Sequence, residues 1–278
     1  MLDLYHLRDN DQDRYLACLL SPSNMRISLA ILYSFNAELM RVPKITSNPL
    51  TGEIRLQWWR DIFTVPDNDV SQKSTSPFAD KLLSIIQKYD LPYQHFLDMI
   101  EARFFDLYAD SMRDCAQLEV YAFSTASNLI DLAVKILDRE QCSSVYKAIK
   151  HAGIAQSIGE LSLWMSIHYS RGQLYIPLDI LGASGLDRES FLSGDNKEKI
   201  SLAISIFAEW GLDHLIRARK EIQHIPQNIF PAFLPMYMTG RILKNTQKNG
   251  AKILDNPYTV HQCLRQLYML YSSVKKRF

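Results

Sequence analysis

The sequence of 278 residues contains few cysteines, no long apolar run and almost no net charge. Its four cysteines lie far apart and form no C-x-x-C pair, which argues against a zinc site and a redox-active dithiol. No uninterrupted run of about 18 apolar residues occurs, so the sequence predicts no membrane-spanning helix. Lysine plus arginine (31) nearly balance aspartate plus glutamate (30), so the overall charge does not favour nucleic acid as a partner.

Targeting and nucleotide-binding motifs are also missing from the sequence. The first residues, MLDLYHLRDNDQDRYLACLL, are charged from Asp3 onward and contain no apolar segment before a cleavage site. We therefore expect neither a secretory signal nor an organelle transit peptide, and we expect a cytoplasmic location with reduced cysteines. The glycine motifs of nucleotide-binding proteins and serine hydrolases are absent as well, so nothing in the sequence supports those activities.

What the sequence does contain is helical periodicity along almost its whole length. Helices are predicted at 24–42, 53–63, 78–89, 93–110, 114–138, 144–170, 196–224, 231–247 and 259–277. Pro43 is expected to end the first of these helices, and residues 65–77 are expected to form a polar loop. The segment 172–178 alternates too briefly for a strand, so it is predicted as an extended connector. Because no internal repeat occurs, the chain is predicted to be one all-α domain over 1–278.

Five segments, in their order along the chain, resemble the squalene/phytoene synthase family. They are DRYLACLLSPSNMR (13–26), LYSFNAELMRV (32–42), GEIRLQWWRDIF (52–63), the region 102–129 and RGQLYIPLDIL (171–181). The resemblance implies an all-α isoprenoid (prenyl) synthase-like helical bundle with a central cavity, a fold in which family members join two prenyl diphosphates head to head. The predicted helices 114–138 and 144–170 are apolar around most of their circumference, which suits the centre of such a bundle.

The family's metal-binding acids are absent from this sequence. Family members carry two D-x-x-x-D motifs, whose spacing places both carboxylates on one helix face to hold magnesium against the diphosphate. The resemblance places the first pair at Met40 and Lys44 and the second pair at Trp164 and His168. A site without these carboxylates does not concentrate magnesium, so neither a metal site nor a cofactor is predicted. Three other histidines are likewise predicted to be isolated, with a solvated or core role: His151, His214 and His224.

Three features most resemble a branch of the family that lacks the Asp-rich motifs. These features are the FNAEL segment (35–39), the IRLQWW segment (54–59) and the second motif without acids. The branch includes the mitochondrial complex I assembly factor and alphaproteobacterial homologues. Because no transit peptide is expected, the chain fits the bacterial side of this branch.

Ten residues are candidates for contacting a ligand in the cavity or its head group: Asn36, Glu38, Lys44, Arg55, Trp58, Arg103, Trp164, His168, Arg171 and Tyr175. Arg171 and Tyr175 match family residues near the diphosphate, but they also suit a helix cap and a packed connector. Lys44 could contact a phosphate directly. Trp59 is predicted to be part of the core, whereas Trp58 is left open between the core and the rim of the cavity.

Polar residues inside apolar helices need hydrogen-bond partners. Asn36 and Glu38 are expected to bond to Arg26, Arg103 or another helix. Arg103 and Asp106, three residues apart, either line the pocket or form an ordinary intrahelical ion pair.

Two hypotheses of function remain open at this point. The first is a protein that has lost head-to-head prenyl transfer and acts as a lipid-binding or respiratory-complex assembly protein, with a prenyl diphosphate or another lipid as ligand. Its basic C-terminal tail, SSVKKRF, either contacts the inner membrane surface or complements its own helix dipole. The second is an active prenyltransferase that condenses two prenyl diphosphates with magnesium bound in a different arrangement.

Overall fold

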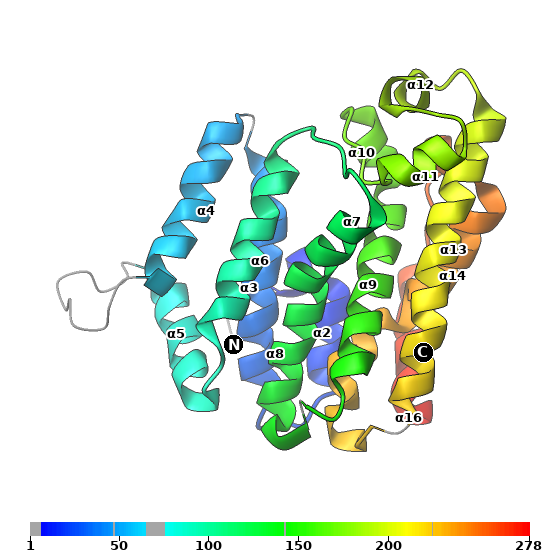
Figure 1. Ribbon diagram of the computed structural model, residues 1–278. Helices are drawn as coiled ribbons and strands as arrows, with labels where there is room; N and C mark the ends of the chain where they lie inside the picture. Colours follow the sequence, from blue (N-terminus) through cyan, green and yellow to red (C-terminus); the bar gives the residue numbers. More distant parts are fainter. Residues whose placement is uncertain (1–6, 47, 65–75, 142, 224) are drawn as a thin grey trace. The chain divides into compact units, whose positions relative to one another are not determined.

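Figure 1 shows the computed structural model, which describes residues 7–46, 48–64, 76–141, 143–223 and 225–278. Every regular element in these ranges is a helix. Contacts between Cα atoms divide the chain into two compact units. Unit 1 comprises 1–108, 128–143 and 226–235, and unit 2 comprises 109–127, 144–225 and 236–278. The prediction of a single domain stays a prediction. Most of the expected loop 65–77, Cys142 and His224 lie outside the described residues.

Unit 1 is built around α3. Its elements are α2 (Gln12–Leu19), α3 (Arg26–Ile45), α4 (Pro49–Thr64), α5 (Pro77–Tyr89), α6 (Tyr93–Phe104), η2 (Phe105–Leu107), α8 (Asn128–Leu137), η4 (Arg139–Gln141) and the first part of η5 (Gln227–Met238). α3 packs against α2, α4, α5, α6 and α8. It is buried on all sides between Ser28 and Ala37, as a helix at the centre of a bundle must be.

Pro43 does not end α3, contrary to the sequence-based prediction, because the helix continues to Ile45. A proline removes one backbone donor and disturbs the preceding turn, which costs most in the middle of a helix. Here only the last two residues follow it. The hydroxyl of Thr46 donates to the carbonyl of Val42 at 2.8 Å and so satisfies a terminal carbonyl that the helix leaves without an amide partner.

An aromatic cluster joins three helices of unit 1. The ring of Phe35 on α3 lies 5.0 Å from Trp59 and 5.9 Å from Phe63, both on α4, and 5.5 Å from Phe96 on α6. The contacts of Phe35 with Trp59 and Phe63 are edge-to-face, which adds to the free energy that burying the rings contributes. Trp59 is only 7% exposed, which confirms its predicted place in the core, whereas Trp58 is 40% exposed.

Unit 2 is built around α9. Its elements are α7 (Cys115–Ala122), the π-helix η3 (Phe123–Ser127), α9 (Tyr146–Leu163), α10 (Met165–Ser170), α11 (Leu178–Ala183), α12 (Arg188–Ser193), α13 (Lys197–Ile222), the end of η5, α14 (Thr239–Asn249), α15 (Lys252–Asp255) and α16 (Gln262–Lys275). α9 packs against η3, α7, α13 and α14 (green, yellow and orange in Figure 1). Nearly all of its residues from Ala152 to Ser162 are buried.

The predicted helix 114–138 is one helical run, but a π-helical turn at 123–127 separates α7 from α8. Among the residues that the structure describes, this run is the one stretch long and apolar enough to span a membrane by length and composition. Because 67% of its apolar window is buried inside the protein, the run has the character of a core helix.

Several helix boundaries differ from the predictions. The predicted helix 144–170 is interrupted at Trp164, where α9 ends and α10 begins. The predicted helix 231–247 starts as a 3-10 helix, since Pro231 and Pro235 cannot donate to an α-helical ladder. The segment 172–178 is irregular apart from its last residue, which begins α11, as predicted for a connector. Sequence periodicity missed four short helices: α2, α11, α12 and α15.

Gly153 allows α9 to approach η3 closely, and this approach provides a test of the packing. A Cβ atom at Gly153 would overlap the Ser127 hydroxyl and lie 2.5 and 2.6 Å from the backbone N and Cα of Ser127. Because backbone atoms cannot turn aside, we expect Gly153→Ala to lower the free energy of unfolding by roughly 3 kcal/mol in urea denaturation. Gly182→Ala is the matched control, since nothing lies within 4 Å of its Cβ position. An equal effect of both substitutions would contradict the packing described here.

Candidate functional site

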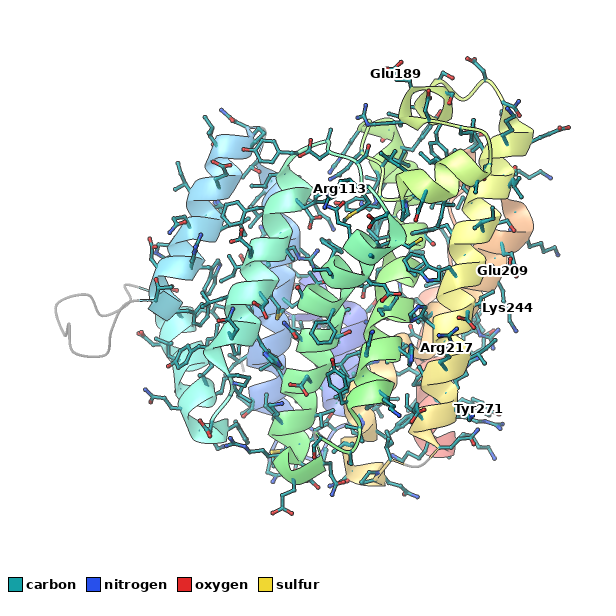
Figure 2. All side chains as sticks on the ribbon, viewed as in Figure 1. Arg113, Glu189, Glu209, Arg217, Lys244 and Tyr271 are labelled. Atoms are coloured by element: carbon teal, nitrogen blue, oxygen red, sulfur yellow. The ribbon has the colours of Figure 1, made fainter. Side chains whose placement is uncertain are left out.

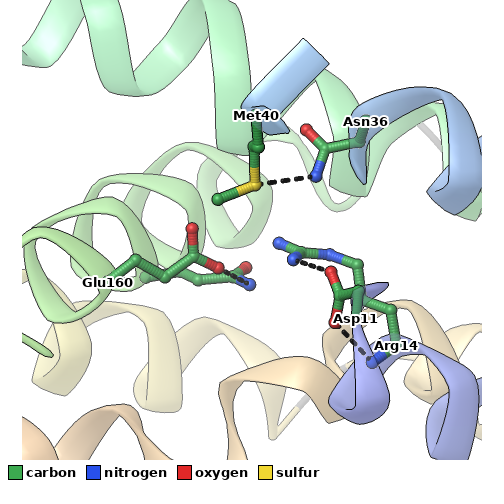
Figure 3. A network of polar contacts seen from close by, with 6 residues as sticks. Asp11, Arg14, Asn36, Met40 and Glu160 are labelled. Carbon is green, nitrogen blue, oxygen red and sulfur yellow. Dashed lines mark hydrogen bonds and ion pairs between the residues drawn. The ribbon is translucent and has the colours of Figure 1, made fainter. Parts of the chain in front are cut away.

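The ten candidate residues fall into both units, so each unit is described by itself. Unit 1 contains Asn36, Glu38, Lys44, Arg55, Trp58 and Arg103, and unit 2 contains Trp164, His168, Arg171 and Tyr175. Figure 3 shows Arg14 with Asp11 and Asn36 with Met40, both pairs in unit 1, and Glu160 of unit 2. Glu160 accepts a hydrogen bond from the Gln156 amide at 3.1 Å.

The polar side chains of α3 have partners on their own helix. The Asn36 amide donates to the Met40 sulfur at 3.3 Å (Figure 3), and Glu38 pairs with Arg41 at 3.4 Å. Of the partners that the sequence suggested, Arg26 donates through its Nε to the carbonyl of Ser21 at 2.9 Å. Residues one turn apart on a helix are close neighbours, so these two contacts lie within α3 and do not depend on its packing against another helix.

Arg103 and Asp106 form a buried ion pair, with Nη1 and Oδ2 3.0 Å apart and both residues less than a tenth exposed. The two residues therefore form the ion pair at a spacing of three that was one of the two interpretations, and it spans the junction of α6 and η2. Asp106 and Asp110 also form a D-x-x-x-D pattern. Because α6 ends at Phe104 and η2 at Leu107, no helix places the two carboxylates on a common face.

Trp58 lines an open groove of about 580 Å³ on the surface of unit 1. The other lining residues are Glu53, Ile54, Gln57, Arg60, Asp61, Glu101 and Phe104. Three carboxylates and one guanidinium give this groove a net negative charge, which does not suit a diphosphate or another anion. Arg55 is exposed on α4 and is not part of the lining, and Lys44 is exposed in the last turn of α3. The two candidate cations, Lys44 and Arg55, are therefore not part of the groove that Trp58 lines.

His168 and Tyr175 pack against each other in unit 2, with ring centroids 4.8 Å apart. Tyr175 is 7% exposed, contacts the ring of Tyr121 and accepts a hydrogen bond from the Gln173 amide at 2.9 Å. The space between His168, Tyr175 and Phe207 measures only about 10 Å³, which is room for one water at most. These side chains leave no room for a ligand. Tyr175 therefore packs the connector 172–178, which was one of the two interpretations of this residue.

Arg171 lies at the surface, where it follows the last turn of α10. Its backbone N–H donates to the His168 carbonyl at 3.0 Å. Its guanidinium forms no hydrogen bond or ion pair with the part of the chain that the structure describes, and it points to solvent. The residue that holds this segment is Arg188, which donates to the carbonyls of Gly172 at 2.9 Å and Ala109 at 3.2 Å. Sequence reasoning missed Arg188, since both of its acceptors are backbone atoms and leave no pattern in the sequence.

Trp164 lines a second pocket of unit 2, with a volume of about 340 Å³. We call it the Trp164 pocket; its other lining residues are Leu163, Ser166, Ile167, Met238, Ile242, Pro257, Tyr258, Thr259, Val260 and Arg265. The lining is apolar apart from a few polar groups and one cation, Arg265, whose Nε donates to the Tyr237 hydroxyl at 3.3 Å. A pocket of this composition suits an apolar chain.

The positions that the resemblance assigned to metal-binding acids do not fit magnesium. Met40, Lys44, Trp164 and His168 offer a thioether, an ammonium, an indole and an imidazole, whereas magnesium takes oxygen ligands. Trp164 and His168 also line different pockets. Within the described ranges, no three His, Cys, Asp or Glu side chains are grouped so that they could hold a metal ion.

His151 and His214 form a pair that sequence reasoning missed, so the prediction that both are isolated was wrong. Their Nδ1 atoms lie 3.1 Å apart, where α9 packs against α13. The Nε2 atom of His214 lies 3.6 Å from a Glu119 carboxylate oxygen. One arrangement satisfies all three groups: His151 Nδ1–H donates to His214 Nδ1, and His214 Nε2–H points at Glu119. The pair is separated by 63 residues in the sequence, and only the packing of the two helices reveals it.

Comparisons with known proteins agree with this description. The family model for squalene/phytoene synthase matches residues 7–265. The chain is 29% identical over 272 residues to NADH dehydrogenase (ubiquinone) complex I, assembly factor 6, of Homo sapiens, a match that covers 98% of this chain and 81% of that protein. It is 28% identical over 123 residues to chloroplastic phytoene synthase 2 of Oryza sativa subsp. japonica, covering 42% of this chain and 31% of that protein.

A solved structure extends the similarity to the fold. A dehydrosqualene synthase in complex with ligand superposes with a TM-score of 0.80 at 16% sequence identity, and the match covers 99% of this chain and 95% of that one. The all-α fold of the prenyl synthase type that the sequence predicts is therefore confirmed.

The two neighbouring tryptophans allow a direct test of which one belongs to the core. We expect Trp59→Ala to lower the free energy of unfolding by about 3–5 kcal/mol, because it removes a buried ring from the Phe35 cluster. Trp58→Ala is the matched control and should cost less than about 1 kcal/mol, since its ring is 40% exposed. Urea denaturation of both variants measures the difference, and similar losses would show that Trp58 is also structural.

The histidine pair predicts a pH dependence of stability. Burial, followed by the charges of His151 and Arg217, lowers the pKa of His214 to about 4. Burial, followed by Arg217 and Lys150, also lowers the pKa of His151. Because the folded-state pKa lies below the unfolded value of about 6.5, the unfolded chain takes up the proton first. The contribution of the histidine pair to the free energy of unfolding is therefore fully present above pH ~6.5 and is lost as the pH falls toward about 4.

Urea denaturation between pH 7.5 and 4.5 tests this pH dependence. Over the titration of His214, we expect the free energy of unfolding of the wild type to fall by up to roughly 3 kcal/mol more than that of His214→Gln. The reason is that glutamine can form a hydrogen bond but does not titrate. Parallel curves for the two proteins would mean that the pair does not control acid stability.

Proposed function

This chain belongs to the squalene/phytoene synthase family, and we propose that it acts in the assembly of a respiratory complex and no longer joins two prenyl diphosphates. The extent of the similarity carries the proposal. Relatives named as complex I assembly factor 6 align along almost the whole chain, whereas the phytoene synthase match covers less than half of it. We infer that the protein works in the bacterial cytoplasm, peripheral to the inner membrane.

The side chains at the family's metal positions support the loss of prenyl transfer. Ionisation of an allylic diphosphate requires cations that neutralise the leaving group, and carboxylates normally hold those cations. Here Met40 accepts a hydrogen bond from Asn36, and His168 lies against Tyr175, so both side chains serve the packing of the protein. Lys44 adds a positive charge where the family has a carboxylate, which repels a divalent cation.

A lipid ligand is the second part of the proposal, and the Trp164 pocket supports it. Its volume of about 340 Å³ and its apolar lining suit part of a prenyl or acyl chain. Arg265 at the same pocket supplies a cation for an acidic head group.

Diphosphate release tests the catalytic part of the proposal. We expect the purified protein, incubated with farnesyl diphosphate and magnesium, to release no more diphosphate than a blank without protein. A squalene or phytoene synthase under the same conditions serves as the positive control. Release that is lost in Arg171→Ala would overturn the proposal in favour of an active prenyltransferase.

Deletion of the gene tests the assembly role. We expect membranes of the deletion strain to contain less assembled NADH dehydrogenase complex on native gels, and expression of the wild-type chain to restore it. Unchanged amounts of the complex would contradict an assembly role.

Native mass spectrometry of freshly purified protein tests the lipid ligand. We expect a copurifying lipid that is lost in Val260→Trp, which fills the Trp164 pocket. It should be retained in Val120→Trp, a matched change at a residue that is 66% exposed on α7. Equal lipid content in both variants would place the ligand elsewhere or show that it binds non-specifically.

A further inference from the structure

The C-terminal helix α16 carries its apolar side chains on the outside of unit 2. Five of them are exposed: Leu264 by 45%, Leu267 by 59%, Leu270 by 48%, Tyr271 by 52% and Val274 by 78%. At 100° per residue they cover a continuous arc of about 120° of the helix, which we call the outer face of α16. Figure 2 shows Tyr271 at the edge of this unit.

The side of α16 that faces the protein is held largely by polar contacts. Arg265 donates to the Tyr237 hydroxyl at 3.3 Å, and the Arg241 guanidinium lies 3.8 Å from the ring centroid of Tyr268. Only Met269 and Ser272 are buried in this helix. A surface helix of a globular protein normally turns its apolar stripe toward the core. The orientation of α16 is the reverse, so its outer face is available to something apolar outside this chain.

Positive charge is concentrated around this helix. Residues 239–278 contain eight basic residues and one acidic residue, although the chain as a whole has a net charge of only +1. Lys275, Lys276 and Arg277 lie at the end of α16. On α14, Arg241, Lys244 and Lys248 are exposed and, at spacings of three and four, share one face. Contact between Arg241 and Tyr268 joins α14 to α16, so basic side chains lie beside the apolar face.

We propose that the outer face of α16 binds the interface of an anionic lipid bilayer. The five apolar side chains enter the head-group region, while the lysines and arginines of α14 and of the C-terminal tail contact lipid phosphates. With 14 residues, α16 is about 21 Å long, which is too short to cross the hydrocarbon core, so it lies in the plane of the interface.

The charge distribution favours this occupant over a second copy of the chain. A symmetric contact through the outer face would bring two strongly basic surfaces together, and like charges at short range repel. An anionic surface neutralises the same residues. The inference does not depend on the proposed assembly role, since either an assembly protein or an enzyme could bind a bilayer in this way.

Vesicle flotation of the full-length protein tests the proposal. The probes are vesicles of phosphatidylcholine alone and vesicles of phosphatidylcholine with about 30% phosphatidylglycerol. We expect at least roughly tenfold stronger binding to the anionic vesicles, and we expect added salt to weaken it. The double variant Lys244→Gln with Lys248→Gln should reduce this preference. Equal binding to both compositions, or no binding to either, would overturn the proposal.

A matched pair of variants distinguishes binding through the outer face of α16 from binding through any exposed apolar side chain. Tyr271→Ser with Val274→Ser should weaken binding to anionic vesicles by about tenfold or more, because two side chains no longer enter the interface. Tyr146→Ser with Val120→Ser removes the same two residue types, exposed by 52% and 66%, elsewhere in unit 2 and should bind as the wild type does. Circular dichroism checks that both variants are folded.

Two further outcomes would refute the proposal. Flotation of the Tyr271→Ser, Val274→Ser variant at the wild-type level would show that the outer face is not the binding surface. A concentration-dependent dimer in analytical ultracentrifugation, lost in the same variant, would assign the face to contact between copies. Neither outcome bears on the assembly role, which the amount of respiratory complex in membranes tests separately.

Discussion

Close packing of helices around α9 is the constraint on which the features of unit 2 depend. Gly153 lets α9 approach η3, and Gly211 lets α13 approach Ile158 of α9, where an added Cβ atom would lie 2.8 Å from a methyl carbon. At such separations side chains on facing helices meet directly, which brings His151 to His214. The end of α9 at Trp164 forms one wall of the largest apolar pocket described in this unit. A wider separation of α9 and α13 would part the two histidines.

The ligands that the molecule can bind depend on which of its polar groups are already paired with one another. Arg103 with Asp106 and Arg14 with Asp11 are ion pairs between residues three apart, the first buried and the second partly buried, so each carboxylate neutralises its neighbouring guanidinium. The groove at Trp58 is negative, and the Trp164 pocket is apolar with a single cation. The groove and the pockets thus offer an anion little beyond Arg265, whereas the basic side chains of α14 and of the C-terminal tail lie at the surface. Binding of apolar chains and surfaces is the property that this distribution of side chains favours.

Sequence periodicity predicted most of the long helices, because burial of one apolar face and amphipathic spacing are local properties of a segment. Trp59 in the core and the Arg103–Asp106 pair follow from the same local rules. The rules failed at Pro43, where burial of α3 outweighs the disturbed last turn, and at η5, where two prolines favour a 3-10 helix over the predicted α-helix. They also missed the short helices, whose length leaves too few residues to establish a period.

The sequence by itself determined the all-α fold, the resemblance to a family and the absence of carboxylates at four positions, since each of these depends only on residue identity and spacing. The tertiary structure alone decided three other features: the histidine pair, the different pockets at Trp164 and His168, and the outward direction of the apolar face of α16. The physical reason is that an amphipathic pattern shows that a helix has an apolar face. Which way that face points, and what it meets, depends on segments distant in the sequence.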